Sequence, residues 1–302
     1  MQNGSRMNFT SLDSWTILSD IEQRIKSKIE ASGTPLKDWD ISINYGIKTG
    51  LNDAFIISGA QKEELIASDP KSAEIIRPIL RGRDIKRYGF NFADLWLIVS
   101  HNGVKEQNIP RIRIEEYPAI KAHLDQYYEK LMRRADKGDT PYNLRNCVYM
   151  DDFSKPKLMW AETMRIQKDN KERFPRFSFC TQELFTDKTC FIATGKNLEV
   201  ILAFLNSIVS RYQLSKTVAM MDNGGYLMQK IYLEQIRIPV FSAERQNALK
   251  RCAEGLLASP SVTKAEEFED EIDDIVFDAF GLTMEEKRYI INTLHQPLSR
   301  GH

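Results

Sequence analysis

The stretch Ile75–Tyr88 reads IIRPILRGRDIKRY and places a glycine between two arginines, with a tyrosine at its end. The window Lys71–Phe90 around it holds six basic side chains against only two acidic ones. Arginine forks bind phosphate or a guanine edge through two parallel hydrogen bonds, an aromatic ring offers a stacking face, and glycine lets a bulky polyanion come close to the backbone. The pattern indicates an anion-binding surface, with these candidate contacts: Arg81, Arg83, Lys86, Arg87 and Tyr88.

The same stretch also fits a structural role. A basic cluster is often a turn followed by a solvated helix face. In that arrangement Asp84 would pair with Arg81 or Arg87 and fix the loop. Residue types alone do not separate contact from scaffold, so both interpretations stay open.

Composition narrows the class of protein. The 302 residues carry no net charge, but residues 261–290 hold ten acids and three bases, so the rest of the chain is basic. No apolar run is long enough to span a membrane and no apolar signal core begins the chain, which predicts a cytoplasmic protein. The four cysteines form no Cys-x-x-Cys pair and the four histidines show no zinc-ligand spacing, so we expect reduced cysteines and no metal site.

Helical and strand patterns alternate irregularly along the chain, which favours an α+β fold over a doubly wound sheet. Isoleucines at every fourth position predict a helix over Ser19–Ser32, capped by Ser19 or Asp20. A hairpin-like turn is expected at Gly46–Gly50, and one long helix at Tyr117–Asp136. Further helices are expected over residues 196–213, 243–257 and 265–280.

An ordered set of short motifs resembles the TaqI-like C-terminal specificity domain. This is the target recognition domain behind the catalytic domain of many adenine-specific DNA methyltransferases and fused type II restriction–modification enzymes. The later motifs are also similar to recognition domains of type I restriction specificity subunits. The resemblance covers roughly residues 15–290 and rests, besides Ile75–Tyr88, on these segments: Trp39–Ile57, Leu95–Ile98, Phe204–Ser207 (FLNS), Asn223–Tyr226 (NGGY) and Ile236–Val240 (IRIPV).

The resemblance implies a curved, mostly antiparallel sheet flanked by helices, with a C-terminal helical extension. It implies an N-terminal connector helix in residues 1–35, a target recognition domain in residues 36–240 and C-terminal helices in residues 241–302. The implied function is sequence-specific recognition of double-stranded DNA beside a methyltransferase or endonuclease domain or subunit. S-adenosylmethionine and Mg²⁺ would then belong to those catalytic domains, and this chain would need no cofactor.

Catalytic motifs are absent from the sequence. It has neither a glycine-rich cofactor turn after a strand nor the Asn-Pro-Pro-Tyr-type loop that holds a flipped adenine. A metal-dependent nuclease needs clustered carboxylates near a lysine. Asp151-Asp152 and Glu285-Glu286-Lys287 match this only weakly, since adjacent side chains point apart. We therefore expect no catalytic residues in this chain.

Other polar stretches supply further candidate DNA contacts. Lys48 and Thr49 are expected at the exposed tip of the hairpin-like turn, where they either enter a groove or are merely solvated. A stretch before the Gly-Gly turn either reads bases or forms the polar back of a helix, and a basic loop after Trp160 is a place where recognition residues usually sit. The candidates from these two stretches are Arg211, Gln213 and Lys216, and Arg165, Gln167, Lys168, Lys171 and Arg173.

The acidic tail leaves a second hypothesis. Phe268, Ile272, Ile275, Val276 and Phe280 form an apolar stripe at helical spacing, which must be buried on this chain or on a partner. In the second case the chain is an interaction module that docks on a separate methyltransferase or restriction subunit and binds DNA only in that assembly. We expect the stripe to pack on its own chain, because it is short and the family's domain usually carries such helices.

Overall fold

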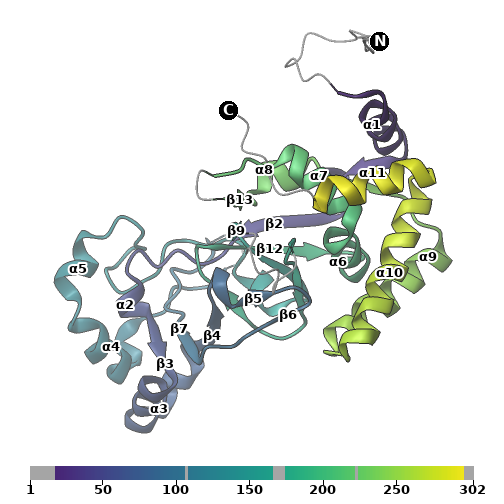
Figure 1. Ribbon diagram of the computed structural model, residues 1–302. Coiled ribbons are helices and arrows are strands. Elements are labelled where there is room, and N and C mark those ends of the chain that lie inside the picture. Colours follow the sequence, from purple (N-terminus) through teal and green to yellow (C-terminus); the bar gives the residue numbers. More distant parts are fainter. Residues whose placement is uncertain (1–17, 106–107, 166–173, 222–223, 296–302) are drawn as a thin grey trace. The chain divides into compact units, whose positions relative to one another are not determined.

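The computed structural model describes residues 18–105, 108–165, 174–221 and 224–295 (Figure 1). They divide into two compact units. The helical unit contains the described residues of 1–39, 203–217 and 232–302, and the sheet unit contains those of 40–202 and 218–231. The first helix and the C-terminal helices therefore share one unit, while the domain boundaries expected at residues 35 and 240 stay a prediction.

Two four-stranded sheets form the framework of the sheet unit. The first has the order β10-β8-β12-β2 and is antiparallel throughout. The second has the order β11-β4-β7-β3, in which only the β11–β4 pair is parallel. Their bounds are β2 Ile41–Tyr45, β8 Lys157–Ala161, β10 Ser178–Cys180, β12 Cys190–Gly195, β3 Ile56–Ser58, β4 Ile76–Leu80, β7 Leu95–Ile98 and β11 Phe185–Thr186.

The two sheets meet where the chain leaves β2. Ile47 forms a parallel bridge with Asp187, and its N–H donates to the Thr186 carbonyl oxygen over 2.7 Å. On the side away from Ile47, Asp187 donates its N–H to the Leu80 carbonyl oxygen over 2.9 Å. Gly46 permits this approach, because a Cβ there would lie 1.9 Å from the Asp187 carbonyl oxygen. Only a residue without a side chain fits this junction.

Short helices and two small hairpins complete the sheet unit. Leu124 on α4 and Leu131 on α5 are fully buried in the core around the second sheet. The small hairpins pair β5 with β6 and β9 with β13. The bounds are α2 Asn52–Phe55, α3 Gly59–Ser68, α4 Pro118–Asp125, α5 Tyr128–Arg133, β5 Ile85–Lys86, β6 Gly89–Phe90, β9 Thr163–Arg165 and β13 Gly225–Leu227.

Three expectations about local structure are wrong here. The single helix expected over residues 196–213 is two helices, α6 Leu198–Asn206 and α7 Ile208–Thr217, which break at Ser207. Gly46–Gly50 is not a hairpin turn, because β2 and β3 belong to different sheets and α2 lies between them. The long helix expected over Tyr117–Asp136 is two helices that break at Tyr127, whose N–H bonds to the Leu124 carbonyl oxygen three residues back. Leu124 and Leu131 still reach the core, so the apolar spacing does not require an unbroken helix.

The helical unit packs its helices around a short strand pair. β1 Gly33–Pro35 is antiparallel to β14 Arg237–Pro239, although some two hundred residues separate them in sequence. The helices are α1 Asp20–Ser32, α7 Ile208–Thr217, α9 Ala243–Leu257, α10 Val262–Ala279 and α11 Met284–His295, while α6 Leu198–Asn206 and α8 Lys230–Leu233 cross the division between the units. Figure 1 shows α9 and α10 side by side.

The apolar stripe of the acidic tail is buried within its own unit. Ile272, Val276 and Phe280 are almost fully inaccessible, and the Phe280 ring lies 6.3 Å from that of Phe204. The Phe268 ring packs so closely on Gly255 of α9 that a Cβ there would clash with it. Intramolecular packing of the tail is therefore confirmed. The α+β class, the mostly antiparallel pairing and the C-terminal helices are confirmed as well.

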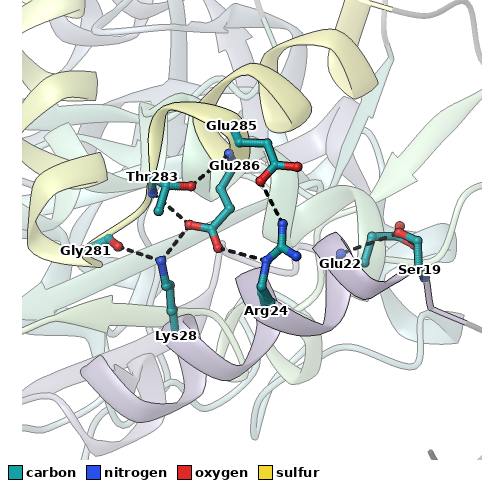
Figure 2. Close-up of polar contacts among 8 residues, drawn as sticks. All are labelled: Ser19, Glu22, Arg24, Lys28, Gly281, Thr283, Glu285 and Glu286. Atoms are coloured by element: carbon teal, nitrogen blue, oxygen red, sulfur yellow. Dashed lines mark hydrogen bonds and ion pairs between the residues drawn. The ribbon is translucent and has the colours of Figure 1, made fainter. Parts of the chain in front are cut away.

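Polar contacts join α1 to α11 around one buried carboxylate (Figure 2). The Glu286 side chain is 1% exposed and accepts hydrogen bonds from Lys28 Nζ and the Thr283 N–H, each over 2.7 Å. Arg24 pairs with Glu285 over 2.9 Å and lies 3.7 Å from Glu286. Burial alone would raise the pKa of Glu286, but the bonds from Lys28 and Thr283 outweigh it and hold the pKa below the ordinary 4.5.

Replacing Lys28 by methionine should lower the free energy of unfolding by about 1–3 kcal/mol near neutral pH, because the buried Glu286 loses its closest charged partner. The folded-state pKa of Glu286 is depressed, so the pair stabilises the protein above the ordinary value of 4.5 and less as pH falls through the folded-state pKa. The difference between wild type and variant should therefore shrink in acid. Urea denaturation over a series of pH values measures it.

Lys26 on the same helix provides the matched control. It pairs with Glu30 over 3.9 Å, and both side chains are more than half exposed. Such a pair contributes little, so Lys26→Met should leave stability nearly unchanged. Equal losses in the two variants would contradict the importance of the buried pair.

Candidate nucleic-acid interface

Arg81 takes the structural role that the sequence left open. Its Nε and Nη2 donate to the two carboxylate oxygens of Asp84, each over 2.9 Å, and its main-chain N–H also donates to Asp84 over 2.9 Å. Asp84 is buried; desolvation would raise its pKa, but the bonds from Arg81 lower it overall. The pair closes a 3-10 turn over Gly82–Asp84 that leads into β5, so no solvated helix face forms. Whether Arg81 also contacts DNA stays a prediction.

The turn projects Arg83 and buries Tyr88. Arg83 is exposed and forms no hydrogen bond or ion pair with any residue that the structure describes. Tyr88 is only 6% exposed, has a left-handed φ of 57° and donates its N–H to the Phe177 carbonyl oxygen. Its ring therefore presents no open stacking face. Lys86 and Arg87 are half-buried in the same hairpin.

Hydrogen bonds place the second basic stretch beside this hairpin. Arg87 donates to the Pro175 carbonyl oxygen over 3.2 Å, close to the bond between Tyr88 and Phe177. Arg176 donates to the carbonyl oxygen of Arg165, which is exposed at the end of β9. The structure thus places Arg87 beside Pro175 and joins Arg176 to Arg165, whereas Gln167, Lys168, Lys171 and Arg173 lie outside the described residues.

Of the two residues expected at an exposed tip, Lys48 is exposed and Thr49 is buried. Lys48 is exposed, with its ammonium 5.3 Å from the Tyr45 ring centre. Thr49 is 1% exposed, and its hydroxyl donates to Asn52 Oδ1 over 2.6 Å. The expectation of an exposed Thr49 is wrong, because the chain turns inward after Lys48 to start α2 instead of folding back as a hairpin.

The candidates on α7 support the helical unit. Gln213 is 8% exposed, and its amide donates to the Arg237 carbonyl oxygen and accepts from the Arg237 N–H, each over 2.9 Å. Arg211 donates to the Leu294 carbonyl oxygen over 3.3 Å. Lys216 pairs with Glu22 over 2.8 Å; burial raises the pKa of Glu22, but this bond and those from Ser19 bring it down to about 2. The Gln213 amide is thus engaged by the main chain and not open to a base edge.

The two weak nuclease matches are also occupied by structural contacts. Asp152 is buried, pairs with Lys155 over 2.9 Å and accepts from Asn44 over 3.0 Å. Glu286 forms the buried contact between α1 and α11. Within the described parts of the chain, no three His, Cys, Asp or Glu side chains gather as a metal site would require.

Comparisons with known proteins give a likeness of fold. No protein-family model and no curated protein matches the sequence. Among solved structures, the type IIL restriction–modification enzyme MmeI in complex with DNA matches 86% of this chain, with a TM-score of 0.65 and 12% identity. The type IIG restriction endonuclease BpuSI also matches 86% of the chain, with a TM-score of 0.49 and 16% identity. The chain spans 37% and 33% of their lengths.

The MmeI match shows that this chain shares its fold with part of a restriction–modification enzyme, which agrees with the coarser form of the resemblance seen in the sequence. The specific likeness to TaqI-type specificity domains stays a prediction. No helix among the described residues is both long and apolar enough to cross a membrane.

The two arginines beside Gly82 should differ in their effect on stability. Arg81→Ala leaves the buried Asp84 without its two-pronged partner and should lower the free energy of unfolding by about 1.5–3 kcal/mol. Arg83→Ala removes an exposed side chain and should change the free energy of unfolding by less than about 0.5 kcal/mol. Urea denaturation of both variants tests this; an equal loss in Arg83→Ala would show that Arg83 also supports the turn.

Proposed function

We propose that this chain is the DNA target recognition domain of a restriction–modification system and carries no catalytic site of its own. The observation that carries the proposal is the fold shared with part of MmeI, an enzyme whose structure was determined in complex with DNA. The exposed arginines of the sheet unit add the chemistry that such a role needs, since cations on an uncompensated surface attract the phosphate backbone.

In this proposal the sheet unit supplies the DNA contacts. Arg83 and Arg165 are exposed, and neither side chain is hydrogen-bonded or ion-paired to any residue that the structure describes, so they can bind phosphates or guanine edges without first breaking an ion pair. Arg81, Tyr88 and Gln213 would hold this surface and its neighbouring elements in shape. Recognition would be rigid, because the turn is fixed by a buried carboxylate.

The chemistry itself would come from a partner. A methyltransferase or endonuclease domain or subunit would bind S-adenosylmethionine and Mg²⁺, and the assembly would act on double-stranded DNA in the cytoplasm. TaqI-like specificity domains remain the family that we propose for this chain. The proposal keeps the exposed Arg83 of the Ile75–Tyr88 motif as a DNA contact.

The alternative, an interaction module that binds DNA only inside an assembly, would rest on the outer face of the acidic tail. The apolar side of that tail is already buried in its own unit, so only its charged outer side is open to a partner. We therefore favour direct DNA recognition.

Duplex binding by the isolated chain tests the proposal. Selection from a random pool of duplexes should enrich one sequence motif, and affinity for that motif should fall steeply with salt. Arg83→Ala should flatten the log–log salt dependence by about one. Binding without sequence preference, or none, would contradict the proposal, and methylation or cleavage by the pure chain with S-adenosylmethionine and Mg²⁺ would contradict its non-catalytic part.

A further inference from the structure

Three neighbouring segments of the sheet unit are parallel, so the chain leaves all three at the same end. β4 and β11 are parallel, with Thr186 opposite Leu80, and the chain after β2 is parallel to the chain after β11 through the Ile47–Asp187 bridge. Asp187 lies in the middle, since it contacts Ile47 on one side and Leu80 on the other. The residues that follow each segment must therefore emerge next to one another.

Each of the three segments continues into an exposed cation. Lys48 follows Ile47, Lys188 follows Asp187, and Arg83 lies in the turn after β4. Thr189 keeps that turn beside Lys188, because the Gly82 N–H donates to its hydroxyl over 2.9 Å. Within the described residues, none of the three cations has an ion-pair partner, although the Lys48 ammonium lies 5.3 Å from the Tyr45 ring centre. We call Lys48, Lys188 and Arg83 the cation row.

Several carboxylates near the cation row bind other groups. Asp187 points back into its own turn, where its Oδ1 accepts from the Thr189 N–H over 3.0 Å and from the Thr189 hydroxyl over 2.5 Å. Asp84 is engaged by Arg81. Asp53 and Asp136 do line an open hollow of about 430 Å³ next to Lys188, and Asp136 pairs with Arg145 over 3.2 Å. Asp187, Asp84 and Asp136 are thus engaged by other groups, and none of these carboxylates forms an ion pair with the cation row.

The length of the cation row is comparable to that of a short stretch of nucleic-acid backbone. Neighbouring segments of a sheet lie about 4.8 Å apart, so a row across three of them spans roughly 10 Å before the side chains spread. One strand of duplex DNA carries a phosphate for about every 3.4 Å along the helix axis, so the row faces about three successive phosphates. The lysine ammonium is a compact charge on a flexible stem, which suits contact with phosphate more than with a base edge.

We propose that Lys188 binds a DNA phosphate at the centre of this row, between phosphate contacts made by Lys48 and Arg83. This inference rests on the proposed function and assigns a contact that the basic motifs of the sequence do not include. Lys188 stands alone between Asp187 and Thr189 in the sequence, and only the junction of the two sheets brings it beside the other two cations.

The test is duplex binding of Lys188→Gln and Lys188→Arg across a range of salt concentrations. Lys188→Gln should weaken binding about fivefold to tenfold near 0.1 M salt and flatten the log–log slope by about one, because one counterion-releasing contact is lost. Lys188→Arg should keep the wild-type slope. The triple variant with Lys48→Gln and Arg83→Gln should flatten the slope by about three.

Lys250→Gln supplies the control, since Lys250 is exposed on α9 in the helical unit and carries the same charge. It should bind with the wild-type slope. A wild-type slope in Lys188→Gln, or a change as large in Lys250→Gln, would overturn the assignment of Lys188 while leaving the proposed function intact. Failure of the wild-type chain itself to bind duplex DNA would overturn both.

Discussion

The close approach of Gly46 to Asp187 is the contact on which the sheet unit depends. It joins the two four-stranded sheets through the Ile47–Asp187 bridge, and the hydrogen bond from Asp187 to Leu80 extends the joint to β4. The basic turn after β4 and the exposed Lys48 after β2 take their positions from this joint. The proposed DNA surface thus depends on how the two sheets are joined, because this joint sets the positions of its basic residues.

Much of the local structure could be predicted from the sequence, because local signals decide it. Ser19 accepts a hydrogen bond from the Glu22 N–H and starts α1, and the isoleucines at positions 25 and 29 face the core. The helix at 243–257 also begins and ends where its pattern predicts. The path of the chain at Gly46–Gly50 could not be predicted, since Gly46 permits the approach of the distant Asp187 and does not form a hairpin.

The candidate site also shows that the sequence alone does not determine the role of each basic residue. Arg81 and Arg83 have the same side chain two positions apart, yet one is bound to a buried carboxylate and the other is exposed. Elsewhere, the buried Arg134 donates to the main-chain carbonyl oxygens of Thr49, Asp136, Pro141 and Asn143, and its burial lowers its pKa to about 10. A search for basic clusters in the sequence therefore includes arginines with structural roles, and it misses the proposed contact at Lys188, whose neighbours come from distant segments.

The central claim is that the joint at Gly46 holds both the fold of the sheet unit and the proposed DNA surface, and Gly46→Ala tests it most directly. The added methyl group must push against the main chain at Asp187, whereas the same change at Gly89 meets no atom within 4 Å. At a temperature where both variants are folded, Gly46→Ala should lose about 1–3 kcal/mol of stability and bind duplex DNA more weakly, although no charge has changed, and Gly89→Ala should match the wild type. Wild-type stability and wild-type affinity in Gly46→Ala would contradict the account.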